Sequence, residues 1–381
     1  MKISSHFDSG SIEVVAIATD GNIDLKLRLD EVSDPSVQIR QWFHFRLQGA
    51  RGQAVNLRIH NAGAATYPGG WKDYRACASY DRLHWFRVET HYEGEGGVLT
   101  ISHSPERDSV YYAYFEPYSW ERHLQLLGRA EDSPLARVRD LGASLDGRDL
   151  NVIEIRSEAG ALEKRACWII ARQHPGETMA EWLAEGVIER LLDPFDPVSH
   201  ALLDEAAFYI VPNMNPDGSV RGNLRVNAAG ANLNREWVEP TLERSPEVFH
   251  VRAAIEETGC DFFLDVHGDE TIPYVFAAGN EMLPTSTEAQ KAEQARYLQA
   301  LAAAAPDFQL KHGYPSGRYS EDALKLASKW IGHRYGCVSL TLELPFKDNF
   351  DRPDAYVGWN GERSKRLGRD LLAALAQTWR A

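Results

Sequence analysis

The pattern of apolar residues changes near residue 115 of this 381-residue chain, and this change restricts the possible folds more than any other feature. Before it, short alternating runs rich in β-branched and aromatic residues are separated by turn residues, which is typical of an antiparallel β-sandwich. From Pro117 onward, apolar strand-like runs alternate with stretches of helical periodicity, which indicates a parallel or mixed sheet covered by helices on both faces. We therefore predict a small all-β sandwich domain over residues 1–115 and an α/β domain over residues 116–381.

The same periodicity predicts the individual elements. In the first domain we expect strands at residues 12–18, 23–29, 41–49, 54–60, 84–92, 97–103 and 109–115. In the second domain we expect strands at residues 152–157, 166–174, 206–213, 261–268 and 337–344, and helices at residues 120–130, 178–192, 248–259, 288–305 and 361–379.

Composition excludes several classes of protein. The 41 Lys and Arg residues against 55 Asp and Glu residues give a net charge of −14, so the chain lacks the basic surface that nucleic acid or an anionic membrane would need. No signal peptide is visible, and no apolar run approaches the roughly 18 residues of a transmembrane helix. The four cysteines form no C-x-x-C pair and read as free thiols of a reducing compartment. We expect a soluble, cytoplasmic protein of undetermined oligomeric state.

The strongest local signal for chemistry is the tetrad His174-Pro175-Gly176-Glu177. His174 ends an apolar strand and Glu177 begins the next helix, so an imidazole and a carboxylate lie at the carboxyl end of a strand, where open α/β sheets bind ligands. Catalytic zinc takes His and carboxylate ligands and keeps one coordination position open. The structural alternative is a carboxylate that favours a helix N-terminus beside a histidine that ends the strand.

His267 is the candidate for a third zinc ligand, because it ends the apolar run 262–266 just before Gly268. A short spacer between the first two ligands followed by a long spacer to the third is common for catalytic zinc. Asp265 and Asp269 flank this histidine, and either orient its imidazole or are simply solvated.

Two further segments bring polar groups to the same edge of the predicted sheet. In the polar excursion 215–237, Arg225 and Arg235 can each offer a planar donor fork to an oxygen anion, or else pair with local acids. Glu343 lies near the end of the apolar strand 339–345, where an unpaired carboxylate is costly. It is a candidate general base beside zinc, or else it accepts a hydrogen bond from a backbone amide.

Four motifs occur in the order found in zinc metallocarboxypeptidases: HPGE at 174–177, NPDG…GNLR…NLNREW at 215–237, DVHG at 265–268 and TLELPF at 341–346. The chain most closely resembles the cytosolic carboxypeptidase branch of that family. That branch removes glutamates from protein C-termini and from side-chain polyglutamate, and it carries a β-sandwich ahead of the peptidase domain. Residues 67–88 also resemble the N-terminal domain of this branch.

The resemblance implies a deglutamylase-like zinc carboxypeptidase whose partners are peptide or protein C-termini. It implies one zinc ion per chain held by His174, Glu177 and His267, Glu343 as the catalytic glutamate that assists the attack of water, Arg225 polarising the scissile carbonyl, and Asn234 with Arg235 gripping the terminal carboxylate. The tyrosine that closes over the substrate in this family is not placed: Tyr314 and Tyr319 fall in the right region, but the spacing of their segment aligns neither of them with the family. Arg318, Lys325 and Lys329 lie in a stretch that is suited to attracting an acidic side chain, or else they sit on an exposed helix face.

Two other functions are compatible with the sequence. Zinc amidohydrolases of the aspartoacylase or succinylglutamate desuccinylase type share a His-x-x-Glu…His set and a segment like Asn232–Arg235, but Glu343 and the separate first domain favour the peptidase. A binding protein with a decayed site would usually have lost at least one catalytic position, whereas all are filled here apart from the unplaced tyrosine. The natural substrate and the role of the N-terminal domain stay open at this point.

Overall fold

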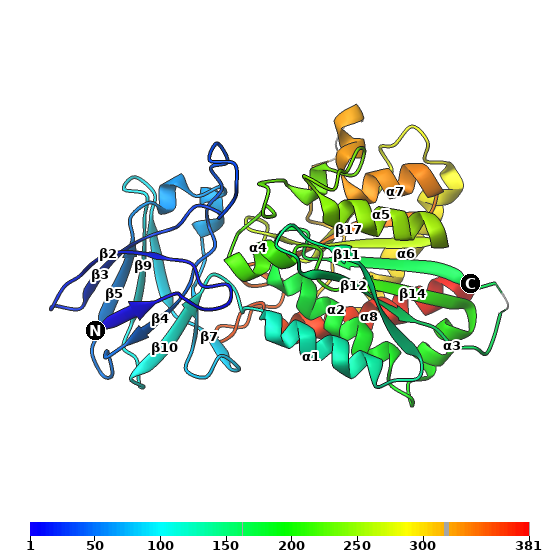
Figure 1. The fold of residues 1–381 in the computed structure, drawn as a ribbon. Coiled ribbons are helices and arrows are strands. Elements are labelled where there is room, and N and C mark those ends of the chain that lie inside the picture. The colour runs from blue at the N-terminus through cyan, green and yellow to red at the C-terminus, as the bar shows by residue number, and fades with distance from the viewer. Residues whose placement is uncertain (162, 316–319, 381) are drawn as a thin grey trace.

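The computed structural model describes residues 1–161, 163–315 and 320–380 and shows two domains side by side (Figure 1). The N-terminal domain consists of two five-stranded sheets with the orders β1-β4-β10-β6-β7 and β2-β3-β5-β9-β8. Its strands are β1 (Lys2–Ser4), β2 (Glu13–Ile17), β3 (Asn22–Lys26), β4 (His44–Gln48), β5 (Val55–Ile59), β6 (Cys77–Ser79), β7 (Trp85–Arg87), β8 (Glu89–Glu93), β9 (Val98–His103) and β10 (Ser109–Ala113).

The predicted all-β sandwich is confirmed, with two local differences. β3 and β5 pair in parallel, because the chain passes through β4 in the other sheet before it returns beside β3. The run predicted as one strand at residues 84–92 is divided into β7 and β8, which belong to different sheets. The sandwich is therefore antiparallel except for one pair.

The second domain is built on a seven-stranded mixed sheet of order β11-β12-β14-β13-β15-β17-β16. Its central strands β14, β13, β15 and β17 run parallel, and the strands at both edges are antiparallel to their neighbours. The strands are β11 (Ala136–Ala143), β12 (Asp149–Ile155), β13 (Arg165–Ala171), β14 (Ala206–Val211), β15 (Phe262–Asp269), β16 (Phe276–Ala278) and β17 (Val338–Pro345). This arrangement confirms the predicted α/β class.

Helices cover both faces of this sheet (Figure 1). α2, α3, α6 and α8 pack in one apolar cluster, and α5 and α7 pack in a second. The helices are α1 (Trp120–Glu131), α2 (Thr178–Leu191), α3 (Pro197–Glu205), α4 (Pro216–Arg221), α5 (Pro246–Thr258), α6 (Glu288–Ala304), α7 (Ala327–Tyr335) and α8 (Gly361–Arg380). Among the described helices, none combines the length and hydropathy needed to cross a bilayer.

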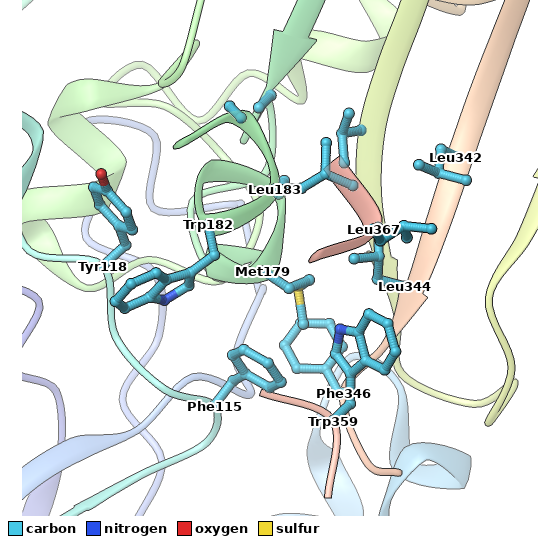
Figure 2. Packing of buried hydrophobic residues seen from close by; sticks show 14 of the residues in the cluster. Phe115, Tyr118, Met179, Trp182, Leu183, Leu342, Leu344, Phe346, Trp359 and Leu367 are labelled. Carbon is cyan, nitrogen blue, oxygen red and sulfur yellow. The ribbon is translucent and has the colours of Figure 1, made fainter. Parts of the chain in front are cut away.

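The core beneath the carboxyl edge of the sheet brings α2 close to β15 and β17. Figure 2 shows Met179 and Leu183 of α2 packed near Leu344 of β17 and Leu367 of α8. A Cβ atom on Gly268 would lie 2.6 Å from the Met179 sulfur and 3.0 Å from the Phe346 ring, so a side chain here would displace these neighbours. The start of α2 therefore lies directly beside the end of β15.

A buried charge fastens the two domains together. Arg87 of the N-terminal domain is 7% exposed, and its Nη2 donates to the carbonyl oxygens of Phe346, Lys347 and Trp359 at 2.8, 2.9 and 3.0 Å. These acceptors belong to the segment that follows β17. Because separation of the domains would leave a guanidinium and several carbonyl groups without partners, the two domains act as one structural unit.

Candidate active site

A buried arginine fixes the turn that carries His174 and Glu177. Arg172 follows β13 with a left-handed φ of 60° and is 1% exposed. Its guanidinium donates to the Pro175 carbonyl oxygen at 2.9 Å and pairs with Glu181 of α2 at 2.6 Å. Since one partner lies within the tetrad and the other in the helix that follows it, His174 and Glu177 are held at the carboxyl end of β13.

The side chains of His174, Glu177 and His267 converge. Glu177 Oε1 lies 2.7 Å from His174 Nδ1, and Glu177 Oε2 lies 2.8 Å from His267 Nδ1. The two Nδ1 atoms are 3.1 Å apart, and one ligand atom from each of the three residues lies within 4.8 Å of the others. Ligand atoms bound to tetrahedral zinc at about 2.0–2.1 Å lie roughly 3.3 Å apart. The spacing of these donors therefore fits a zinc ion.

The hydrogen bonds on the far side of each imidazole also fit a metal ion. His174 Nε2 lies 3.0 Å from Asn232 Oδ1, and His267 Nε2 lies 2.9 Å from Asp265 Oδ2. These oxygens accept the Nε2 protons, which leaves the Nδ1 lone pairs directed at Glu177 and at each other. Such lone pairs would repel one another without a cation between them.

The two histidines of this set differ in their electrostatic environment, because burial and the charge of Arg225 lower the pKa of His174 to about 4. Burial lowers the pKa of His267, but the carboxylates of Asp265 and Glu177 outweigh it and raise this pKa well above its ordinary value. Burial raises the pKa of Glu177, but His174 and His267 outweigh it and hold this pKa well below its usual range. The ionised form of Glu177 and the neutral form of His174 are the forms in which these groups bind a divalent metal.

Glu343 faces the three donors from the neighbouring strand, where the register of β15 and β17 pairs it with His267. Its Oε1 accepts a hydrogen bond from the Tyr314 hydroxyl at 3.0 Å, whereas its buried Oε2 has no hydrogen-bond partner among the described residues. Burial raises the pKa of Glu343 to about 8, and the nearby charges of Glu177 and Asp269 contribute. A carboxyl with a pKa near neutrality is suited to both taking up and releasing a proton.

These residues line a cavity of about 1330 Å³ that also contains Arg225 and Arg235. Arg225 Nη1 lies 4.0 Å from Glu177 Oε1. Arg235 Nη1 donates to the Asn234 carbonyl oxygen at 2.7 Å, and burial together with the charge of Arg225 lowers the pKa of Arg235. Two neighbouring guanidinium groups in a partly desolvated cavity form a site suited to an anion.

The Asn234 side chain also reaches this cavity. Its Nδ2 lies 3.2 Å from His267 Nε2, and its Oδ1 accepts a hydrogen bond from the Ala327 backbone N–H at 2.9 Å. Since the oxygen is already bonded at the start of α7, the amide nitrogen is the group that remains on the cavity side. The structure thus brings together all seven residues that the sequence marked as a candidate site.

Of the two candidate tyrosines, Tyr314 lies in the cavity wall, with its hydroxyl bonded to Asp269 Oδ2 at 2.9 Å as well as to Glu343. Tyr319 lies outside the described residues. No spacing in the sequence could choose between them, and the described residues 309–315 before Tyr319 form neither a helix nor a strand.

The three candidate cations for an acidic side chain differ in position. Lys329 is 6% exposed and lines the cavity, where its Nζ donates to the Gly279 carbonyl oxygen. Lys325 is half-exposed and pairs with Asp322 at 2.8 Å. Arg318 lies outside the described residues. Lys329 is thus the described candidate in the cavity wall.

Two residues of the cavity wall carried no signal in the sequence. Tyr67 comes from the N-terminal domain, and the Arg225 guanidinium carbon lies 5.4 Å from the centre of its ring. Burial raises the pKa of the Tyr67 hydroxyl to about 12. Glu270 follows β15, and its buried Oε1 has no hydrogen-bond partner among the described residues. Tyr67 reaches the cavity only because the two domains dock, which no local pattern could reveal.

The chain matches two models of known families. A model of the cytosolic carboxypeptidase N-terminal domain matches residues 3–115, and a model of the zinc carboxypeptidase family matches residues 121–359. Among curated relatives, an uncharacterized protein of Zymomonas mobilis is 48% identical over 99% of this chain and 96% of its own length. Human cytosolic carboxypeptidase 6 is 27% identical over 98% of this chain and 78% of its own length.

Solved structures give the same result. A metallo-carboxypeptidase from Burkholderia cenocepacia is 53% identical with a TM-score of 0.96, covering 100% of this chain and 99% of that chain. A metallo-carboxypeptidase from Pseudomonas aeruginosa, solved with (2-guanidinoethylmercapto)succinic acid, is 45% identical with a TM-score of 0.93, covering 99% and 98%. The chain therefore belongs to the zinc carboxypeptidase family, as a hydrolytic exopeptidase with one zinc ion per chain.

Proposed function

We propose that this protein removes C-terminal glutamate from peptides or proteins. The observation that carries the proposal is a set of three metal donors and an unpartnered buried carboxylate in one cavity that also holds two arginines and a buried lysine. The assigned roles are metal binding by His174, Glu177 and His267, proton transfer by Glu343, polarisation of the carbonyl by Arg225, and carboxylate binding by Asn234 and Arg235.

Each residue around the three donors has a separate proposed role in hydrolysis. A zinc ion bound there supplies Lewis acidity for a water molecule and for the scissile carbonyl. Glu343 takes a proton from the attacking water at Oε2, the oxygen without a partner among the described residues, and passes it to the leaving amine. Arg225 donates to the carbonyl oxygen as negative charge develops on it. This sequence needs no covalent intermediate.

Arg235 and Asn234 are the proposed anchor for the substrate's free carboxylate. A guanidinium that burial and a neighbouring cation destabilise gains from an anion, and its planar fork matches a carboxylate. The Pseudomonas relative was solved with a succinic acid derivative, a ligand that carries carboxyl groups, which supports an anion site in this family.

Amidation of the substrate's C-terminus is expected to lower kcat/KM by about 10²-fold or more, because charge-assisted hydrogen bonds of about 1.5–3 kcal/mol each are lost. Arg235→Lys should also damage turnover of free peptides, since lysine keeps the charge but not the fork. Arg244→Lys is the matched control, because Arg244 pairs with Glu236 at 3.1 Å on an exposed surface. Mass spectrometry of timed digests measures both effects. Internal cleavage, or equal trimming of free and amidated peptides, would contradict the exopeptidase assignment.

The preference for glutamate is proposed to depend on Lys329. Burial lowers the pKa of Lys329 to about 8, so the cation is poorly solvated and gains from a carboxylate. Lys329→Gln is expected to lower kcat/KM for peptides ending in glutamate by roughly 10–100-fold, the effect of one charge-assisted hydrogen bond. The kcat/KM for peptides ending in leucine should stay within a few-fold of the wild-type value.

Lys325→Gln is the control for this experiment, because Lys325 is paired with Asp322 and does not line the cavity. Peptides that differ only in the final residue provide the measurement. If the wild-type enzyme prefers peptides with hydrophobic C-terminal residues, the proposed glutamate specificity is wrong, whereas the proposed hydrolytic mechanism is unaffected. The same digests with N-acetylaspartate and N-succinylglutamate test the amidohydrolase alternative, which we expect to give no product.

A cytoplasmic location stays a prediction. It is supported by the four cysteines, all of which are free thiols in the structure. Cys260 and Cys337 lie with their sulfurs 3.9 Å apart without a disulfide, as expected in a reducing compartment.

A further inference from the structure

The N-terminal domain contributes Tyr67 to a cavity whose other wall residues come from the peptidase domain. The ring of Tyr67 faces the Arg225 guanidinium at 5.4 Å, a distance typical of a cation–π contact. The Tyr67 backbone is fixed by the buried Gln41, which accepts its N–H at 2.8 Å and donates to its carbonyl oxygen at 3.1 Å. The ring is therefore presented to Arg225 by a rigid part of the first domain.

A second residue of the N-terminal domain holds the backbone of Arg225. Asp30 is 6% exposed, and its Oδ1 accepts the Leu224 N–H at 2.7 Å. Its Oδ2 accepts the N–H groups of Arg225 at 2.9 Å and Val226 at 3.2 Å. This segment of the peptidase domain has no regular secondary structure of its own. One carboxylate from the other domain thus satisfies consecutive backbone donors that would otherwise be unpaired.

The turn next to Tyr67 fits tightly against the end of β15. A Cβ atom on Gly70 would lie 3.0 Å from Glu270 Cβ and 3.1 Å from the Glu270 carbonyl oxygen. The missing side chain at Gly70 therefore allows the first domain to approach the strand that carries His267. This close approach sets where Tyr67 enters the cavity.

We propose that Asp30 and Tyr67 are positioning residues for hydrolysis, and that the N-terminal domain acts through them by fixing Arg225 in the cavity. The proposal rests on the role proposed above for Arg225. Arg225 Nη1 is held 4.0 Å from Glu177 Oε1, beyond hydrogen-bond distance, so its donors stay available to the substrate. Without the two contacts from the first domain, the guanidinium can move onto the Glu177 carboxylate and be lost to the substrate.

The test compares three variants of the full chain. Tyr67→Leu removes the aromatic ring that faces Arg225. Asp30→Asn replaces one carboxylate oxygen with an NH₂ group, which cannot accept a hydrogen bond from the backbone N–H groups. Both are expected to lower kcat about 10–100-fold with KM within a few-fold and zinc content unchanged, since small misplacement of a group that acts in the transition state costs about this much. Tyr67→Phe keeps the ring and should keep kcat within a few-fold of wild type.

Asp8→Asn is the matched control for Asp30→Asn. Asp8 is a half-buried carboxylate of the first domain that also accepts a backbone N–H of the second, from Trp120 at 2.8 Å, but it lies away from the cavity. Its replacement should leave kcat unchanged. If Asp30→Asn does not fold, the comparison of Tyr67→Leu with Tyr67→Phe decides the question.

Combination with Arg225→Ala separates this inference from the proposed function. If Tyr67 and Asp30 act through Arg225, adding Tyr67→Leu or Asp30→Asn to Arg225→Ala should cause no further loss of kcat. Additive losses, or normal kcat in Tyr67→Leu beside a damaged Arg225→Ala, would overturn this inference alone. Full activity of Arg225→Ala would instead contradict the role of Arg225 itself, and this inference with it.

Discussion

Replacement of Glu343 by glutamine is expected to leave zinc bound and to lower kcat by about 10²–10⁴-fold, the range for loss of general acid–base catalysis. Glutamine has nearly the same shape, so Tyr314 can still donate to the remaining oxygen as it does now at 3.0 Å. The amide nitrogen cannot accept a proton from water, and it occupies the place of the carboxylate oxygen that lacks a partner among the described residues. The fold and the metal donors therefore stay in place while proton transfer is lost.

Zinc per chain and steady-state kinetics of the same preparation measure this effect. Glu281→Gln is the control, because Glu281 lines the same cavity but accepts a hydrogen bond from Gln294 away from the metal donors. It should keep kcat within a few-fold. A Glu343→Gln protein without zinc would show that Glu343 is a ligand, and one with normal kcat would show that another group carries the proton.

The positions of His174, His267 and Glu343 could be predicted because each lies at or near the carboxyl end of a buried strand. In a buried parallel sheet, the residue at the carboxyl end of a strand is fixed by the strand itself, so His174, His267 and Glu343 needed only the correct strands. β13, β15 and β17 are buried at nearly every position and were predicted to within a few residues. Here local sequence and tertiary position agree.

Elements with weak or short patterns could not be predicted in the same way. β11 is an edge strand that is half-buried along much of its length, and β1, β6 and β16 have three residues each, too few to show a period. The short helices α3, α4 and α7 lie in regions where polar residues interrupt the pattern. These elements form because tertiary contacts stabilise them.

The parts of the site that depend on domain docking were also out of reach. Asp30 is an ordinary loop aspartate until the segment at Arg225, almost two hundred positions away, places three N–H groups on it. Tyr67 precedes a Pro-Gly-Gly turn that reads only as a loop. Contacts between residues this distant have no periodicity and no fixed spacing, so one sequence contains no local trace of them.

Replacement of His267 by alanine is expected to abolish stoichiometric zinc binding and activity together. His267 supplies one of the three protein donors that come together among the described residues, and its Nδ1 lies 2.8 Å from Glu177 Oε2. Loss of an outer partner of a metal-bound histidine typically costs 10–100-fold in affinity, so loss of the donor itself should cost more than about 100-fold. Asp265 would also lose the His267 imidazole, which now lies 2.9 Å from its carboxylate. The buried negative charge of Asp265 would then lack this partner.

His123→Ala separates loss of zinc from loss of a buried histidine. His123 is 2% exposed, as His267 is, and it also pairs with a carboxylate, that of Glu181 at 2.7 Å, but outside the cavity. This control should bind one zinc ion per folded chain. Since zinc binds only the folded state, a chelator should lower Tm of wild type and His123→Ala, and should leave Tm of His267→Ala unchanged. One zinc per chain in His267→Ala, or a chelator-sensitive Tm, would mean that the metal is held by a different set of residues.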